Sequence, residues 1–350
     1  MKLPGKLQSM TAYTPVTGNY TVRLDANESF LPMPNRLGDR MAETLAQVPL
    51  HRYPDPEAAG VRRLAADLFG LNMEQIIAGN GSDELIGLIM AALVPHGGRV
   101  LLTDPDFSMY RFYAELHELA CTAIGKPDRR PDVDAVLREA ARQSPDLVIF
   151  SNPSNPSGLG ASQKDVMRLL DGVDCPVVVD EAYMEFWDQS LIPDIPQYEN
   201  LLILKTCSKA FGLAGLRLGF ALGGPELIGA LQKVRSPYNV NALTQAVGEV
   251  VLSEPAYLKD CVDTIKEATA SMLDGLRDLT SQTGGRISVL PTETNFVLLK
   301  TPGAANLFDG LRNRGILVRQ LGPELLRITA GSPEDQAILF AALEDILTNG

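Results

Sequence analysis

The stretch "NLLILKTCSKAFGLAGLRLGFALGG", residues 200–224, says most about how this chain folds. Its first aliphatic run, 201–204, and its second, 217–224, both have the composition of strands buried on both faces. Between them, glycines and alanines surround a single lysine, Lys209, and Arg217 follows eight residues later. A solvated surface lysine needs no such small neighbours, so this loop is expected to let its backbone approach a ligand closely.

Aliphatic runs alternate with amphipathic stretches on the N-terminal side of this segment. Further strands are predicted at 99–105, 146–158 and 176–183, and helices at 82–94, 107–120 and 163–172. This alternation predicts an α/β fold, a mostly parallel sheet with helices on both faces.

The pattern changes after residue 240. One long helix is predicted from Ala242 to about Thr280, followed by strand-like segments at 286–290, 294–300, 316–321 and 325–331. We therefore expect a large domain at 51–240 and a smaller α+β domain at 241–350, which the N-terminal segment 1–50 joins.

Charge and composition exclude several classes of protein. The net charge of −12 is the opposite of what a nucleic-acid-binding protein usually carries. The N-terminus has no apolar core of signal-peptide length, and no apolar run approaches the length of a membrane span. Four cysteines without CxxC spacing and three unpaired histidines indicate neither a metal site nor a disulfide framework. A cytoplasmic enzyme is the expectation.

Polar residues follow several of the predicted strands, at the sheet edge where such folds bind ligands. They are Asn155 in the proline-rich end of 146–158, Asp180 and Tyr183 at the end of 176–183, Thr206, Ser208 and Lys209 after 201–204, and Ser82 and Asp83 after Gly79–Asn80–Gly81. The last pair begins a predicted helix whose backbone N–H groups could bind an anion.

Each group has an alternative interpretation. An aliphatic run that ends in Asp-Glu also occurs in magnesium-dependent NTPases, but the chain contains no GxxxxGK[ST] stretch. Gly79–Asn80–Gly81 begins like a dinucleotide fingerprint and lacks its third glycine. Ser82 could simply cap its helix, and Asn155 could be a turn residue.

Taken together, the groups suit one ligand with a phosphate, a ring nitrogen and an electrophilic carbonyl. Pyridoxal phosphate has these parts. A lysine forms a Schiff base with its aldehyde, and an aspartate keeps the pyridine nitrogen protonated. Lys209 is then a buried nucleophile, and Arg217 binds the phosphate beside it.

Seven motifs resemble those of fold-type I pyridoxal-phosphate aminotransferases, and more narrowly those of histidinol-phosphate aminotransferases. They are "RLDANES", "HRYPDP", "GNGSDE", "NPSNPSG", "VVVDEAYMEF", "KTCSKAFGLAGLRLGF" and "LRITAG", in the order and spacing of that family. The resemblance covers residues 11 to 335, nearly the whole chain.

The resemblance implies roles for the residues at the cofactor ring. Lys209 would be the Schiff-base lysine, and Asp180 would pair with the pyridinium nitrogen. Tyr183 and Asn155 would hydrogen-bond the ring oxygen. Phe107 stands where the family usually has a tyrosine stacked on the ring, which keeps the stacking and loses the hydroxyl.

The resemblance also implies a phosphate site and a dimer. The phosphate would be bound by the backbone N–H groups of Ser82 and Asp83 and by the side chains of Thr206, Ser208 and Arg217. The Asp83 carboxylate should then point away from it. Tyr53, in "HRYPDP", would reach the site of the neighbouring subunit, which implies an obligate homodimer.

For the substrate, the resemblance implies that Arg327 binds its anionic end and that Asn27 belongs to the same pocket. Arg319 could converge with Arg327 on a substrate phosphate, or it could be a solvated edge-strand residue. Tyr13 and Tyr20, near the N-terminus, could cover the pocket.

The implied reaction is transamination between histidinol phosphate and 2-oxoglutarate, a step of histidine biosynthesis. The alternatives are an aromatic amino-acid aminotransferase, a threonine-phosphate decarboxylase and a non-catalytic regulatory module of the same fold. The decarboxylase would need additional cations within residues 11–30, where only Arg23 stands, and "NESFLPMP", residues 27–34, departs from the family's usual run. The regulatory module generally carries an appended DNA-binding domain, which this chain does not suggest.

Overall fold

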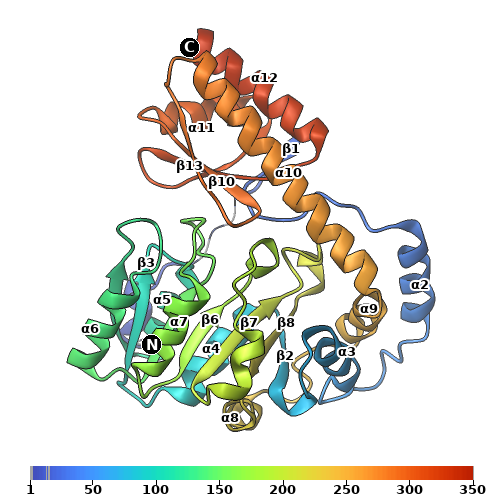
Figure 1. The fold of residues 1–350 in the computed structure, drawn as a ribbon. Helices are drawn as coiled ribbons and strands as arrows, with labels where there is room; N and C mark the ends of the chain where they lie inside the picture. The colour runs from blue at the N-terminus through green and yellow to red at the C-terminus, as the bar shows by residue number, and fades with distance from the viewer. Residues whose placement is uncertain (1–2, 13, 15, 350) are drawn as a thin grey trace.

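A seven-stranded sheet forms the centre of the larger part of the molecule (Figure 1). A computed structural model describes residues 3–12, 14 and 16–349. Along the sheet the strands are β2 (Ile76–Asn80), β8 (Leu218–Gly223), β7 (Leu201–Thr206), β6 (Val177–Asp180), β5 (Leu147–Ser151), β3 (Arg99–Asp104) and β4 (Ala120–Gly125). β8 runs antiparallel to the other six strands of this sheet, which are parallel to one another. The predicted mostly parallel α/β architecture is confirmed.

Helices cover both faces of this sheet because its strands are apolar on both sides. Val177 and Val179 of β6 belong to one hydrophobic cluster, and Val178 between them belongs to another. The first cluster is closed by α3 (Ala59–Phe69), α6 (Val133–Gln143), α7 (Gln163–Asp171) and α9 (Ala242–Leu252). The second is closed by α4 (Ser82–Leu93), α5 (Ser108–Leu116) and α8 (Pro225–Val234).

The smaller part has its own antiparallel sheet and core. Its strands are β12 (Arg319–Gln320), β13 (Leu325–Thr329), β10 (Phe296–Lys300) and β9 (Ser288–Leu290). The helices packed on it are α11 (Ala304–Asn313), α12 (Pro333–Asn349) and the C-terminal half of α10 (Pro255–Gln282). The N-terminal segment joins it, since β1 (Val22–Arg23) pairs in parallel with β11 (Ile316–Leu317).

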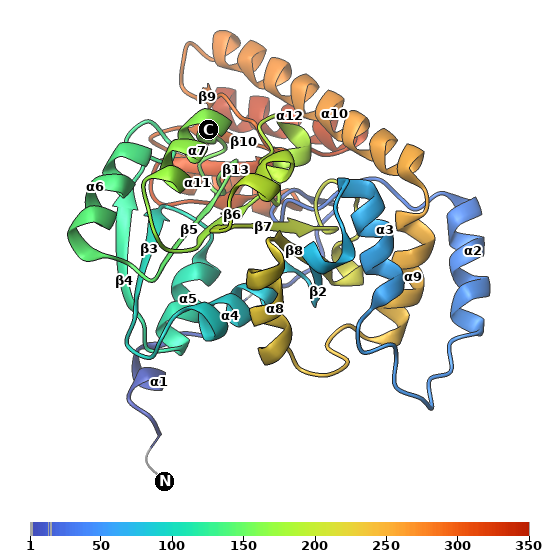
Figure 2. The same ribbon diagram turned by 60° about the horizontal axis from the view of Figure 1, so that its bottom comes forward.

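The remaining elements pack on the large part. They are α1 (Lys6–Ser9), α2 (Asn35–Ala46) and the short 3₁₀ helices η1 (Met73–Gln75), η2 (Met184–Phe186), η3 (Ile192–Gln197) and η4 (Ala214–Leu216). α1 lies beside α5, where the Lys6 amine donates to the carbonyl of Leu116 at 2.8 Å (Figure 2).

Several predicted elements were wrong in their extent, and the strands predicted at 146–158 and 176–183 end earlier, at Ser151 and Asp180. The long helix at 242–280 is two helices, α9 and α10, because Pro255 has no N–H to continue the first and instead begins the second. The helix at 107–120 ends at Leu116, and Glu118, with φ of 58°, turns the chain into β4. The strand at 316–321 is two strands in two different sheets, β11 and β12.

The domain boundaries at 50 and 240 remain predictions, and the packing favours a later second boundary. α9 packs against α2 and α3 on the large part (Figure 2). In α10, Leu258 and Ile265 belong to the core of the large part, whereas Met272 and Leu276 belong to that of the small part. A boundary within α10 therefore fits the packing better. Within the described residues, no helix is both long and apolar enough to cross a membrane.

Candidate active site

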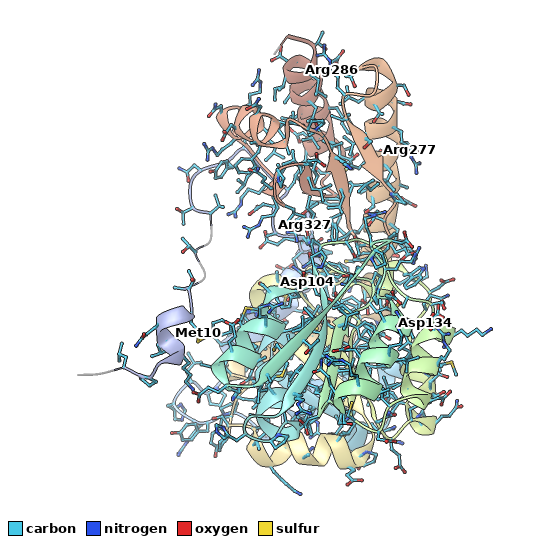
Figure 3. All side chains as sticks on the ribbon, turned by 90° about the vertical axis from the view of Figure 1, so that its left-hand side faces the viewer. Met10, Asp104, Asp134, Arg277, Arg286 and Arg327 are labelled. Carbon is cyan, nitrogen blue, oxygen red and sulfur yellow. The ribbon has the colours of Figure 1, made fainter. Side chains whose placement is uncertain are left out.

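A cavity of about 620 Å³ lies where the carboxyl ends of β5, β6 and β7 face the small part. Figure 3 shows Arg327 at this junction, with Asp104 below it at the edge of the large part. The large part contributes Ser82, Asp83, Phe107, Asn155, Asp180, Tyr183, Thr206, Ser208, Lys209 and Arg217. The N-terminal segment contributes Asn27 and Glu28, and the small part contributes Arg319 and Arg327. Most of the predicted site residues therefore line one cavity.

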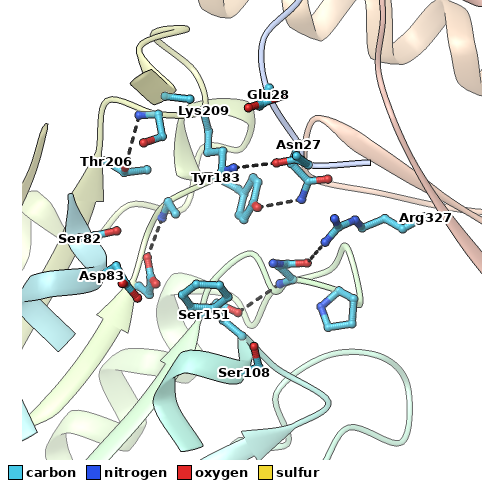
Figure 4. A pocket seen from close by; sticks show the side chains of 18 of the residues that line it. Asn27, Glu28, Ser82, Asp83, Ser108, Ser151, Tyr183, Thr206, Lys209 and Arg327 are labelled. Carbon is cyan, nitrogen blue, oxygen red and sulfur yellow. Dashed lines mark hydrogen bonds between the residues drawn. The ribbon is translucent and has the colours of Figure 1, made fainter. Parts of the chain in front are cut away.

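Lys209 lies in the middle of this cavity (Figure 4). Its Nζ donates a hydrogen bond to the carbonyl oxygen of Ala26 at 3.0 Å. Burial and the positive charge of Arg327 lower the pKa of Lys209 to about 8, although Glu28 opposes the shift. Roughly a tenth of this amine is therefore an uncharged nucleophile at pH 7, and about half of it at pH 8.

Asp180, the last residue of β6, is 4% exposed and fully engaged. Its Oδ2 accepts the hydroxyl hydrogen of Tyr110 at 2.7 Å, and its Oδ1 accepts the N–H of Ala182 at 3.1 Å. Burial raises the pKa of Asp180 to about 6, against the effect of those hydrogen bonds. This carboxylate would thus gain stabilisation from a cation brought to it by a ligand.

Tyr183 and Asn27 connect the large part to the N-terminal segment. The Nδ2 of Asn27 donates to the hydroxyl oxygen of Tyr183 at 2.8 Å. Asn27 has a left-handed backbone, φ of 54°, and its N–H donates to Thr329 Oγ1 at 3.0 Å. Asparagine adopts this conformation more readily than most residues. The side chain of Asn27 is thereby fixed over the cavity.

Arg327 joins three segments that are distant in the sequence. Its Nη1 donates to Asn155 Oδ1 and its Nη2 to the carbonyl of Asp25, both at 2.6 Å. Arg319 and Arg327 are directly opposite in the β12–β13 ladder, and both line the cavity. The interpretation of Arg319 as a solvated edge residue is therefore less favoured than its convergence with Arg327.

The opposite end of the cavity is the N-terminus of α4. Its N-cap residue, Gly81, has φ of 81° and offers no capping side chain. A Cβ on Gly219 would lie 2.3 Å from the nitrogen of Ser82, and one on Gly81 would lie 2.7 Å from Arg217 Nη2. Only glycines therefore allow this close approach of β8, α4 and the guanidinium. The result is a cradle of backbone N–H groups and positive charge that suits an anion.

Asp83 stands beside this cradle. Its Oδ2 accepts the hydroxyl hydrogen of Tyr113 at 3.3 Å, which holds one oxygen toward α5. Its Oδ1 is buried and accepts no hydrogen bond from any residue that the structure describes. Burial raises the pKa of this carboxyl.

Two predicted residues that the structure describes, Tyr53 and Tyr20, are not part of this lining. Tyr53 is 80% exposed, and its ring stacks on that of Tyr238 with centroids 4.5 Å apart. Tyr20 does not line the cavity, to which the described N-terminal segment contributes Asp25, Ala26, Asn27 and Glu28. Tyr13 lies outside the described residues.

The sequence prediction missed Tyr110, Asp106 and Ser151, which also line the cavity. Tyr110 is buried and bonded to Asp180, and its hydroxyl group is the only sequence-level sign that it differs from its apolar neighbours. Asp106 precedes Phe107, and a polar residue beside the predicted stacking ring was the signal available for it.

The family model for aminotransferase class I and II matches residues 20–343. The chain belongs to this family. The resemblance found in the motifs is thus confirmed, and with it the prediction of an aminotransferase.

Relatives and solved structures agree with this assignment. A histidinol-phosphate aminotransferase of Clostridium kluyveri is 36% identical over 346 residues, with 97% of each chain covered. The structure of a histidinol-phosphate aminotransferase from Sinorhizobium meliloti in complex with pyridoxal-5'-phosphate has a TM-score of 0.88 at 24% identity, covering 99% of this chain and 98% of that one. That of an L-threonine-O-3-phosphate decarboxylase from Porphyromonas gingivalis has a TM-score of 0.80 at 24% identity, covering 93% and 99%. The predicted fold-type I architecture is confirmed, and since both enzymes share it, the fold alone leaves the substrate open.

Proposed function

We propose that the protein is a pyridoxal-phosphate-dependent aminotransferase that acts on histidinol phosphate. The observation that carries this proposal is the arrangement of three groups in one cavity. A lysine amine with a pKa near 8, a buried carboxylate and an uncapped helix N-terminus with an arginine beside it line the same cavity. Few cofactors require a nucleophilic amine, a carboxylate and an anion cradle together.

The residues present fit pyridoxal phosphate. The cradle at Ser82, Gly81 and Arg217 would hold its phosphate, with the hydroxyls of Thr206 and Ser208 close by. Asp180 would pair with its ring nitrogen, and Phe107 would pack on its ring. When bound, this cofactor offers an aldehyde to an amine and a protonated ring that withdraws electrons from the carbon next to the substrate nitrogen.

Lys209 has two tasks in this proposal. Its Nζ would attach the cofactor, and the same Nζ, once released, would take the proton from the substrate carbon that bears the nitrogen. Asp180 holds the ring proton in place, while Tyr183 and Asn155 would hydrogen-bond the ring oxygen. Arg319 and Arg327, at the other end of the cavity, would bind the anionic end of the substrate.

The charges that line the cavity support histidinol phosphate over the alternatives. Among its described lining residues, the cationic side chains are Lys209, Arg217, Arg319 and Arg327. The first two are assigned to the cofactor, which leaves one pair of arginines for one anionic group. A phosphorylated amino alcohol needs one such group, whereas a phosphorylated amino acid needs sites for both phosphate and carboxylate. The substrate named for the relative of C. kluyveri supports the same choice.

We also propose a homodimer in which Tyr53 serves the partner's site. Tyr53 is 80% exposed, and Leu50 beside it is 73% exposed, which is unusual for large apolar side chains. Tyr238, whose ring stacks on that of Tyr53, is 38% exposed and extends this apolar surface. A cytoplasmic location is part of the same proposal and rests on the sequence alone.

A set of half-reactions tests the substrate. The cofactor-loaded protein is mixed separately with histidinol phosphate, glutamate, phenylalanine and O-phosphothreonine, without any oxo acid, and the visible absorbance of the bound cofactor is followed. We expect rapid loss of absorbance with histidinol phosphate and glutamate, and slower loss with phenylalanine. Preferred reaction with phenylalanine, or release of CO₂ from O-phosphothreonine, would contradict the proposal. The Lys209→Ala variant is the matched control.

A further inference from the structure

A buried ion pair lies directly behind the cavity. Lys126, which follows β4, has its Nζ 2.8 Å from Asp106 Oδ2, and the two side chains are 0% and 2% exposed. The same Nζ donates to the carbonyl of Pro105 at 2.9 Å and to Ser154 Oγ. Burying two charges costs more than an exposed pair and adds little net stability, so the pair calls for another explanation.

Asp106 holds two residues that face the proposed cofactor. Its Oδ1 accepts the N–H of Phe107 at 2.8 Å and the hydroxyl hydrogen of Ser151. Ser151 Oγ in turn accepts the N–H of Asn155 at 3.2 Å. The Oδ2 of Asp106 accepts hydrogen bonds from Thr103 Oγ1 and from Lys126 Nζ. The carboxylate of Asp106 therefore fixes the backbone of Phe107 directly and that of Asn155 through Ser151.

Asp106 also acts on Asp180 through its charge. Ser151, which Asp106 binds, is the residue of β5 directly opposite Asp180 on β6. The negative charge of Asp106 raises the pKa of Asp180 and of Tyr110, beyond the larger effect of burial. Other groups that interact with Asp180 are the Tyr110 hydroxyl, the Ala182 N–H and Lys205 from β7, together with Lys209 and Tyr183, whose own pKa values the charge of Asp180 raises. The positive charge of Lys126 offsets the negative charge of Asp106, and the negative charge of Asp104 also acts on Lys126.

We propose that the Lys126–Asp106 pair is a positioning element of the active site, in which Lys126 neutralises Asp106 so that Asp180 stays ionised toward the cofactor ring. Asp106 supplies the geometry by fixing Phe107 and Asn155. Lys126 supplies the charge that makes this buried carboxylate compatible with a second one nearby. The inference rests on the proposed cofactor.

The test measures how tightly pyridoxamine 5'-phosphate binds the full-length protein, freed of cofactor, between pH 5 and pH 9. This probe has the cofactor's ring and phosphate but no aldehyde, so it does not attach to Lys209. Its affinity should fall on the acid side as Asp180 becomes protonated, because a neutral carboxyl no longer favours the protonated ring. The titration of the probe itself is the same for every variant and cancels in the comparison.

We call the pH range over which the affinity falls the acid limb, and we expect three variants to place it at three different pH values. Lys126→Met leaves the negative charge of Asp106 unopposed and should move the limb up by about one pH unit, a tenfold loss of affinity below it. Asp106→Asn leaves Lys126 unopposed and should move the limb down. The double variant, Lys126→Met with Asp106→Asn, has no charge at either position and should return the limb close to that of the unaltered protein.

A purely structural role predicts something else. Loss of packing lowers the affinity by the same factor at every pH, and the double variant is then at least as weak as the weaker single variant. The inference would be overturned if the acid limbs of the two single variants did not move in opposite directions. Asp106→Asn is nearly isosteric, so its direction alone decides the matter if Lys126→Met fails to fold in a thermal unfolding control. Failure of the unaltered protein to bind the probe would contradict the proposed function itself.

Discussion

The two ends of the cavity are built in different ways. The anion cradle comes from neighbouring strands of one sheet, where the N-terminus of α4 and Arg217 meet through glycines at positions 81 and 219. The arginine end is assembled from Asn155, Asp25 and Arg327, which are separated by 130 or more positions along the chain. One end is thus set by local backbone geometry, and the other depends on how the small part and the N-terminal segment sit on the large part.

This difference explains what each end can specify. Backbone N–H groups held by glycine contacts have no freedom to suit a different ligand, which is appropriate for a cofactor that every turnover uses. Arginines on two short strands, held by hydrogen bonds to other segments, can be repositioned by small changes elsewhere. We therefore expect cofactor binding to be sensitive to substitutions at the first end and substrate choice to substitutions at the second.

The largest effect is expected between the two ends, at Lys209. Lys209→Ala removes both the attachment amine and the proton carrier, so turnover should fall by at least about 10³-fold while the chain still folds. In the unaltered protein, attachment of pyridoxal phosphate should increase with pH around a midpoint near 8, where the amine loses its proton. Borohydride reduction followed by peptide mapping locates the attachment. A label on Lys205 instead would contradict the assignment.

The next largest effect is expected at Asp180. Asp180→Asn should lower turnover by about two orders of magnitude, since the ring proton loses its partner. Its effect on folding has the opposite sign. Because the pKa is raised from 3.8 to about 6 in the folded protein, the native carboxyl destabilises the cofactor-free protein as pH rises through this window.

Chemical unfolding of the cofactor-free proteins checks this sign. At pH 8 the Asp180→Asn variant should be more stable by up to about 3 kcal/mol, and at pH 4 the difference should largely vanish. Near-normal turnover, or a variant less stable at pH 8, would return Asp180 to a structural role.

The arginine end should affect substrates unequally. Arg319→Ala removes one charge-assisted contact, which costs roughly 1.5–3 kcal/mol, so the KM for histidinol phosphate should rise about tenfold to hundredfold. The KM for phenylalanine, which has no phosphate, should rise less. Equal increases for both substrates would place Arg319 outside the phosphate site and would weaken the contrast between the two ends.

The smallest effect is expected at Tyr53, which would extend the anion cradle across the dimer. Tyr53→Phe should loosen the cofactor by a few-fold to about tenfold and leave the dimer intact. Mixed dimers with Lys209→Ala subunits provide the test. If Tyr53 acts in trans, the one lysine-bearing site of a heterodimer receives its tyrosine from the Lys209→Ala chain, and its cofactor affinity is restored. If Tyr53 acts in cis, mixing restores nothing.

The sequence was sufficient for the end of the cavity that is built locally. Aliphatic runs that end in Asp180 or Lys209 place those residues at one sheet edge, and a helix that begins after Gly81 places its N–H groups at the same edge. It was insufficient where two distant segments meet. The sequence placed Arg319 and Arg327 on two strands that could converge, but it could not reveal that Arg327 donates to Asn155 and to the carbonyl of Asp25, which are 172 and 302 positions away.

The buried polar contacts could not be predicted from the sequence for a related reason. Tyr110 stands in a stretch whose pattern predicts only a helix, and no element was predicted at Lys126. Their partners, Asp180 and Asp106, are 70 and 20 positions away, and only the packed sheet brings each pair together. Tyr20, in contrast, was assigned by resemblance to a pocket that the described chain does not bring it to.

The central claim is that one cavity binds two phosphates, one at each end. A crystal structure of the protein with pyridoxal phosphate and histidinol phosphate, captured in the Lys209→Ala variant so that turnover stops, tests it most directly. We predict one phosphate within hydrogen-bond distance of the Ser82 N–H and Arg217, and a second within reach of Arg319 and Arg327. A substrate phosphate that lies away from both arginines, or a cofactor phosphate away from the N-terminus of α4, would contradict the account.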